Sequence, residues 1–153
     1  MNNSTNTIQV LLLERGGLYF AIPLSFVVRV IPAQEISPVN SNNPVIKGII
    51  NFKGAVMPVL SINARFGIEE KELTINDKFI LMKQNGKKIA LIANNVSDVT
   101  ELDSNNTQKT DTLFPGLSSV NIPGKEHGII YLYNPEIIFT SKDTIDIEKL
   151  SGE

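Results

Sequence analysis

Residues 45–62 of this 153-residue chain read VIKGIINFKGAVMPVLSI and form the densest apolar segment of the sequence. Gly54 divides the segment into two apolar runs, and a glycine at that point is typical of a tight chain reversal because it adopts backbone angles that other residues disfavour. A short apolar run bounded by turn residues is typical of a buried strand. The segment therefore predicts two buried strands joined by a turn at Lys53 and Gly54.

Similar apolar runs, joined by turn residues, occur on both sides of this segment. Gly16-Gly17 joins one pair of runs and Asn85-Gly86 joins another, and both dipeptides indicate β-hairpins. The further strands that we expect are residues 8–14, 18–22, 26–31, 78–83, 87–93, 94–102 and 127–133.

The rest of the chain favours loops and short helical turns. Residues 32–44 and the polar residues 103–112 are expected to be loops, the second of them mobile. The short helical segments that we expect are residues 63–66 before Gly67, residues 137–139 after Asn134-Pro135, and residues 144–150.

The composition agrees with a folded, β-rich chain. Hydrophobic residues make up 42% and charged residues 20%, with a mean hydropathy of +0.03, so the chain has enough apolar surface to offset its conformational entropy. Ile and Val together outnumber Leu and Ala, and β-branched side chains suit a pleated surface better than a helix. Many short strands at regular spacing with little helical periodicity predict a mainly β, small-barrel architecture.

The net charge and the residue content argue against several classes of function and several cellular locations. The formal net charge is −2, so the chain has no overall positive field that would attract nucleic acid. It contains no cysteine, no secretory signal at its polar start and no apolar run long enough to cross a membrane. We expect a cytoplasmic protein that does not insert directly into the membrane.

No group of residues predicts a reaction centre, a metal site or a cofactor site. His127 is the single histidine, and a histidine at a strand entrance is most often an ordinary turn residue. The glycines do not have the spacing of a phosphate-binding loop, and the acidic residues of the connector 69–77 fit a solvated surface. We therefore expect a non-enzymatic protein without cofactors that acts by protein recognition through strand edges and loops.

The central segment also resembles a known sequence motif. Gly48 before a buried strand, an Asn-x-basic-Gly turn at residues 51–54, an apolar-Pro strand at residues 57–60 and the stop Arg65-Phe66-Gly67 resemble the motif of CheW-like domains. Residues 18–24 resemble the first hairpin of that family and residues 86–99 its later strand pair.

The resemblance implies a fold and a domain organisation. Members of the family have two small five-stranded barrels, similar to SH3 domains, that pack on a shared apolar core with short helical turns. The resemblance covers residues 8–140, so residues 1–7 are expected to be a flexible tail and residues 141–153 a C-terminal tail or short helix.

It also implies a function. Family members are adaptors without enzymatic activity that hold the regulatory domain of the histidine kinase CheA to the cytoplasmic tips of methyl-accepting chemotaxis receptors, and are recruited in this way to membrane-bound receptor arrays. Two alternatives stay open: a coupling protein of a pilus, gliding or other kinase pathway, and a small ligand-binding or enzymatic barrel. The last of these would need a closed pocket with polar groups between the barrels.

Six residues are candidates for partner binding. Two are cations and four are apolar: Lys53, Arg29, Val28, Val30, Ile49 and Phe52. The alternative for Lys53 is an ordinary turn lysine, and the alternative for the strand that holds Val28 and Val30 is plain core packing.

Four positions depart from the family pattern. Lys53 replaces the usual arginine, which removes bidentate contact with a carboxylate, and Arg29 stands where an acidic residue is common, which inverts the charge. We expect Arg29 to direct the chain to a specialised set of partners. Ser61 and Asn94 stand where the family tends to show aspartate.

Overall fold

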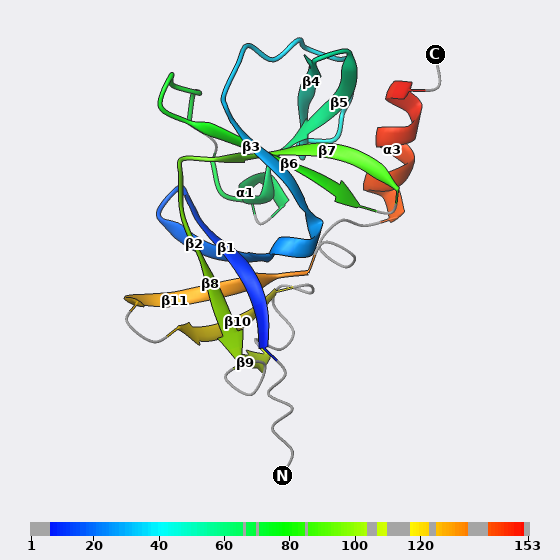
Figure 1. The fold of residues 1–153 in the computed structure, drawn as a ribbon. Coiled ribbons are helices and arrows are strands. Elements are labelled where there is room, and N and C mark those ends of the chain that lie inside the picture. The colour runs from blue at the N-terminus through cyan, green and yellow to red at the C-terminus, as the bar shows by residue number, and fades with distance from the viewer. Residues whose placement is uncertain are drawn as a thin grey trace.

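Two β-sheets, whose strands are mostly antiparallel, make up most of the protein. The structure is a computed structural model, and it describes residues 7–65, 67–69, 71–84, 86–103, 107–109, 117–122, 125–134 and 141–151. The five-stranded sheet has the order β3-β6-β7-β5-β4, and the six-stranded sheet has the order β8-β1-β2-β11-β10-β9 (Figure 1). The strands of the first sheet are β3 (Val27–Pro32), β4 (Ile46–Phe52), β5 (Ala55–Leu60), β6 (Lys78–Gln84) and β7 (Lys87–Ala93). Those of the second are β1 (Thr7–Arg15), β2 (Leu18–Pro23), β8 (Asn95–Asp103), β9 (Thr107–Lys109), β10 (Leu117–Ile122) and β11 (Lys125–Tyr133).

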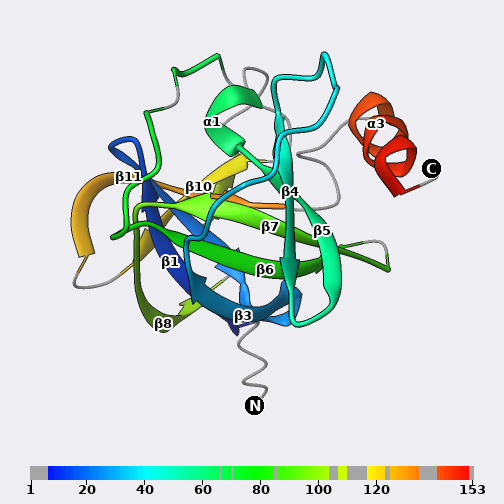
Figure 2. The same ribbon diagram turned by 90° about the horizontal axis from the view of Figure 1, so that it is seen from above.

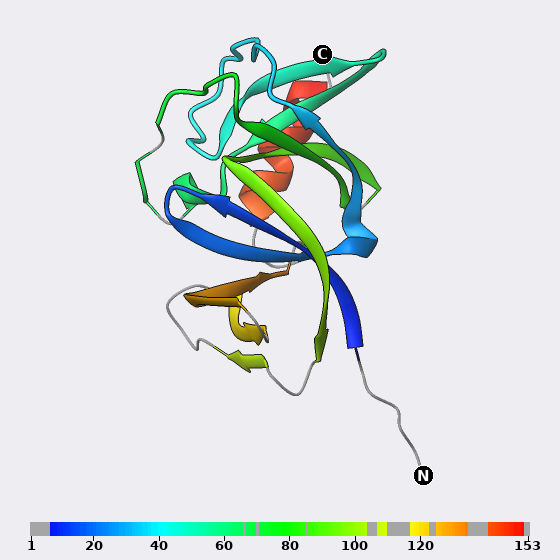
Figure 3. The ribbon, with the colours of Figure 1, turned by 60° about the vertical axis from the view of Figure 1, so that its left-hand side comes forward.

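Each sheet encloses its own apolar core, and a third core lies between the sheets. Residues Val10 and Leu12 of β1 belong to the core of the six-stranded sheet, whereas Leu11 and Leu13 belong to the core that joins the two sheets. Because side chains alternate across a strand, the middle of β1 is buried on both faces, which explains its apolar run at residues 10–13. Figure 3 shows β1 and β2 at the junction of the two sheets. The predicted mainly β fold of two small barrels on a shared apolar core is confirmed.

The predicted hairpins are confirmed where the structure describes them. Strands β1 and β2 pair in register from Val10 with Pro23 to Arg15 with Leu18, across a turn in which Gly16 and Gly17 have φ of 62° and 84°. Strands β4 and β5, and strands β6 and β7, pair in the same antiparallel manner. The predicted hairpin residue Asn85 lies outside the described residues.

The main difference from expectation lies in the six-stranded sheet. Residues 107–109, expected to belong to a mobile loop, form the edge strand β9, and the unpredicted strand β10 pairs with both β9 and β11. The sequence of β10, LSSVNI, has neither a clean alternation nor an apolar run, so its strand state depends on hydrogen bonds from its neighbours. The six-stranded sheet thus has one short strand more than expected.

Helices are few and short. The helix α1 (Ile62–Arg65) matches the predicted turn, and the Ser61 hydroxyl caps it by accepting a hydrogen bond of 3.1 Å from the Ala64 amide. Phe66 and the predicted turn 137–139 lie outside the described residues. The predicted terminal helix is confirmed as α3 (Ser141–Ser151), which stands beside the β4–β5 hairpin (Figure 2).

Candidate protein-binding surface

The turn between β4 and β5 has a defined geometry. Lys53 and Gly54 have φ of 51° and 88°, which is the pattern of a two-residue type I′ hairpin turn. The Asn51 carboxamide oxygen accepts a hydrogen bond of 2.8 Å from the Gly54 amide and holds the turn. Within the chain, a side-chain carbon added at Gly54 would meet nothing within 4 Å. Gly54 is therefore required for its positive φ, and the turn presents Lys53 to solvent.

Two cations lie over one aromatic ring beside this turn. The Lys53 ammonium nitrogen is 5.3 Å from the centre of the Phe52 ring, and the Arg29 guanidinium carbon is 5.6 Å from it. Both distances are within the range of cation–π attraction. Strands β3 and β4, which carry Arg29 and Phe52, are the two edges of the five-stranded sheet. The contact therefore bridges the open side of that barrel.

These residues line a pocket of about 240 Å³, which we call the basic pocket. Three cations and six apolar residues form its wall: Val28, Arg29, Phe52, Lys53, Ala55, Met57, Leu81, Met82 and Lys88. No carboxylate of a described residue lines it. Val28 is 55% exposed and adds an apolar contact surface that the core does not use. The structure thus brings four of the six predicted residues together.

The other two predicted residues lie elsewhere. Val30 is 36% exposed on β3 and does not line the basic pocket. Ile49 lines a separate groove of about 630 Å³, which we call the helix groove, between the β4–β5 hairpin and Ile147 and Leu150 of α3. Ile49 and Phe52 are three residues apart in one strand, and the strand period of two places them on opposite faces. That spacing was a signal in the sequence that would have separated them.

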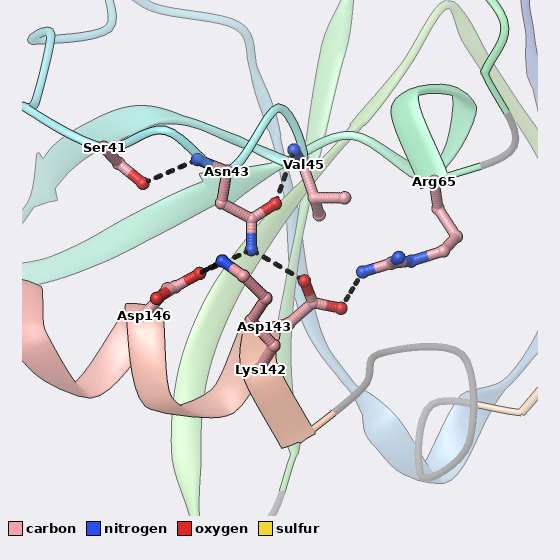
Figure 4. Close-up of polar contacts among 7 residues, drawn as sticks. All are labelled: Ser41, Asn43, Val45, Arg65, Lys142, Asp143 and Asp146. Carbon is pink, nitrogen blue, oxygen red and sulfur yellow. Dashed lines mark hydrogen bonds and ion pairs between the residues drawn. The ribbon is translucent and has the colours of Figure 1, made fainter.

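A polar cluster between α3 and the body of the protein was missed by sequence reasoning (Figure 4). The buried Asn43 side chain donates hydrogen bonds of 2.7 Å to Asp143 and 2.9 Å to Asp146, and its oxygen accepts one of 3.0 Å from the Val45 amide. Arg65 forms an ion pair with the buried carboxylate of Asp143. We call Asn43, Arg65, Asp143 and Asp146 the helix clasp. No short sequence motif predicts this cluster, because its members are up to 103 residues apart in the chain.

Neighbouring groups and burial shift the pKa values of two residues of the helix clasp. Hydrogen bonds from Lys142 and then from Asn43 lower the pKa of the Asp146 carboxyl. Partial burial lowers the pKa of the Arg65 guanidinium, which still stays charged at neutral pH because its ordinary pKa is so high. The clasp therefore holds α3 more firmly when the Asp146 carboxyl is ionised.

The two departures at Ser61 and Asn94 have structural partners inside the chain. Ser61 caps α1, as described above. The Asn94 carboxamide oxygen accepts a hydrogen bond of 2.7 Å from the Gly16 amide, and its nitrogen donates one of 3.0 Å to the buried Asp77. The Arg15 guanidinium lies 4.0 Å from the same carboxylate. Asn94 thus helps to join the β1–β2 turn to the connector before β6.

We also searched the described residues for a metal site and for a membrane-spanning helix. Among them, no group of three or more His, Cys, Asp or Glu is placed to hold a metal ion. No helix in the described part of the chain is long and apolar enough to cross a membrane. His127 lies in β11, as its predicted position at a strand entrance implies.

Comparisons with known proteins agree with this architecture. The family model described as "CheW-like domain" matches residues 9–142. The "Chemotaxis protein CheW" of Treponema pallidum (strain Nichols) is 21% identical over 151 residues, which cover 94% of this chain and 87% of that protein. The "Chemotaxis protein CheW" of Rhizobium meliloti (strain 1021) is 26% identical over 91 residues, 56% of this chain and 59% of that protein.

A solved structure shares the fold. The crystal structure of the scaffolding protein TtCheW from Thermoanaerobacter tengcongensis superimposes with a TM-score of 0.74 at 19% identity, and the match covers 84% of this chain and 90% of that one. The fold consists of two small barrels on a shared apolar core, and the turn at Lys53-Gly54 is of type I′. The family model matches most of the chain. This chain belongs to the CheW-like domain family.

Proposed function

We propose that this chain is a non-enzymatic adaptor of chemotaxis that couples methyl-accepting receptors to the regulatory domain of the histidine kinase CheA. The observation that carries the proposal is the family match over residues 9–142, together with relatives named as chemotaxis proteins and a structural neighbour named as a scaffolding protein. The protein then acts by positioning, and no bond is made or broken. Its place is the cytoplasm, at membrane-bound receptor arrays.

The packing between the sheets supports an adaptor over a ligand-binding barrel. The core that joins the sheets consists of buried apolar side chains from both of them, including Phe20, Leu60 and Met82. A ligand site in that position would need a cavity with converging polar groups. The basic pocket and the helix groove instead lie at the outer edges of the five-stranded sheet, where a macromolecular partner has access.

Partner binding is assigned to the two outer surfaces that hold the predicted residues. Lys53, Arg29, Val28 and Phe52 act together at the basic pocket, and Ile49 acts at the helix groove. Val30 contributes exposed apolar area on β3. Each contact needs only modest affinity, about micromolar or roughly −8 kcal/mol, because simultaneous binding in an array adds avidity.

The test uses partners from the organism that encodes this chain. Isothermal titration of the full chain with the regulatory domain of the kinase and with a receptor cytoplasmic tip is expected to show binding to both at about micromolar affinity. A pulldown from the native cytoplasm identifies the kinase pathway that is served. Failure to bind either partner, with no kinase recovered from the cytoplasm, would contradict the adaptor function.

A further inference from the structure

The chain passes from the five-stranded sheet to the six-stranded sheet through a single residue, Asn94. Strand β7 of the first sheet ends at Ala93, and strand β8 of the second begins at Asn95. The passage in the other direction, from β2 to β3, runs through the short turn η1 (Leu24–Phe26). Because the crossing at Asn94 is so short, the conformation of this residue affects the direction in which β8 leaves the five-stranded sheet.

On one side, Asn94 is bonded to the six-stranded sheet. Its backbone amide donates a hydrogen bond of 2.8 Å to the Glu14 carbonyl, and its carboxamide oxygen accepts the bond of 2.7 Å from the Gly16 amide. Both partners lie at the end of the β1–β2 hairpin, at the junction of the sheets (Figure 3). A side-chain carbon at Gly16 would collide with the Asn63 carboxamide of α1, so the hairpin end also lies close to that helix.

On the other side, Asn94 is bonded to Asp77, which directly precedes β6 of the five-stranded sheet. The Asp77 carboxylate is buried, and it accepts hydrogen bonds of 3.0 Å from the Asn94 carboxamide and 2.9 Å from the Thr74 amide. The Asp77 carbonyl accepts one of 2.9 Å from the Ala33 amide, which follows β3. The buried Arg15 guanidinium of β1 lies 4.0 Å from the same carboxylate. Asp77 is therefore anchored in one sheet and contacts groups of the other.

The apolar core between the sheets and this polar cluster act in different ways. Burial of apolar surface is non-directional, whereas a hydrogen bond weakens steeply when its donor and acceptor move out of line. A rotation of one sheet against the other would preserve much of the apolar burial. It would break the side-chain bonds of Asn94, however, and leave the buried Asp77 carboxylate with fewer donors, which is costly. The polar cluster therefore favours one angle between the sheets.

We infer that Asn94, Asp77, Gly16 and Arg15 form a latch that fixes the angle between the two sheets, with Asn94 as the positioning residue. We call these four residues the inter-sheet latch. The inference goes beyond the proposed function, and only its consequence for partners rests on that function. An adaptor that acts by positioning passes a fixed orientation from one partner to another only when its own two halves keep a fixed angle.

The experiment measures the distance between two nitroxide labels, one on each sheet, by double electron–electron resonance on the full chain. The chain has no cysteine, so Lys83→Cys on β6 and Glu101→Cys on β8 label only these two exposed positions. With the latch intact we expect one narrow distance distribution. Asn94→Ala removes both side-chain bonds of Asn94 and should broaden it. Loss of a hydrogen bond to a charged group should raise the population of displaced orientations about 10-fold to 150-fold.

The matched control is the neighbouring asparagine. Asn95 is exposed, and its carboxamide nitrogen donates a hydrogen bond of 3.0 Å to the Glu14 carboxylate within the six-stranded sheet. Asn95→Ala therefore removes a similar bond that does not join the two sheets. It should leave the distance distribution unchanged.

An exchange of the two latch side chains tests the bond itself. Asn94→Asp alone places two carboxylates against each other, and Asp77→Asn alone places two carboxamides against each other, so each should broaden the distribution. In the double variant, the carboxylate at position 94 still accepts from the Gly16 amide and now accepts from the carboxamide at position 77. That carboxamide still accepts from the Thr74 amide. The double variant should therefore restore a narrow distribution.

Residual dipolar couplings of the backbone amides separate a change of angle from a loss of structure. In Asn94→Ala, the couplings of each sheet alone should fit the structure of that sheet as well as they do in the unchanged protein. A single alignment tensor for both sheets should fit the unchanged protein but not the variant. This difference is not expected if Asn94 only adds stability within one sheet.

Three results would overturn the inference. They are an unchanged distribution in Asn94→Ala, equal broadening in Asn95→Ala, and a double variant as broad as its two single variants. If Asn94→Ala does not fold, the comparison of the double variant with its single variants decides. These measurements need no partner. They can therefore fail while the adaptor function stands, and they can succeed if no kinase or receptor binds.

Discussion

Replacing Arg65 by methionine is expected to loosen helix α3 from the rest of the protein. Asp143 is only 2% exposed, and its carboxylate has two partners in the helix clasp, Arg65 and the Asn43 carboxamide. Methionine keeps much of the length and apolar surface of the arginine side chain but has no charge and no donor. The substitution therefore leaves a buried carboxylate with the Asn43 donor but without its cation.

The magnitude follows from the burial of the two partners. Breaking a fully buried ion pair by removing one partner costs about 3–5 kcal/mol. The Arg65 side chain is 25% exposed and Asn43 still donates to Asp143, so we expect the lower cost of about 2–3 kcal/mol. That cost raises the equilibrium constant for local opening of α3 by about 30-fold to 140-fold.

Native-state hydrogen exchange at the amides of α3 measures this opening directly. Lys142→Met is the matched control, because its ion pair with Asp146 is exposed on the lysine side and is expected to contribute at most about 0.5 kcal/mol. The double variant Arg65→Met with Asp143→Asn should recover part of the lost protection, since it buries no uncompensated charge. Unchanged protection of α3 in Arg65→Met, or equal loss in Lys142→Met, would refute the reasoning.

Three further predictions concern stability, measured by urea unfolding. Gly48→Ala should lower the free energy of unfolding by about 2–3 kcal/mol, because Gly48 has φ of 147° and an added side-chain carbon would clash with the Ser37 carbonyl; a wild-type midpoint would contradict it. Asn94→Asp should lower the free energy of unfolding by about 1–2 kcal/mol at pH 7, since it replaces the donor to Asp77 by a second carboxylate. Burial raises the pKa of the Tyr133 phenol well above its ordinary value, so the folded state keeps a proton that the unfolded state releases. Stability should therefore fall as the pH rises above about 10, and Tyr133→Phe should remove that part of the slope.

Sequence reasoning succeeded where the physics is local. A glycine pair or a Lys-Gly dipeptide adopts the positive φ angles of a hairpin turn whatever surrounds it, so the first two hairpins could be predicted from a few residues. The short helical turn at α1 was predicted in the same way, whereas its cap by Ser61 was not predicted. It failed at β9 and β10, whose strand state comes from pairing with each other and with β11.

The contacts of the candidate surface also fall into those that the sequence predicts and those that it does not. Lys53 and Phe52 are neighbours in one turn, so their association was available from the sequence. Arg29 joins them only because the two edge strands of the five-stranded sheet approach each other in space, and the separation of Ile49 from Phe52 follows from the strand pleat.

Taken alone, the amino-acid sequence determined the β-rich class, the turn positions and the family motif, because each depends on residues within a few positions of one another. The tertiary structure alone decided which cations share a pocket, that no described carboxylate neutralises them, and how Asn43 and Arg65 hold α3. These properties depend on the distance between side chains that are far apart in the chain, and that distance is defined only when the sheets close and pack.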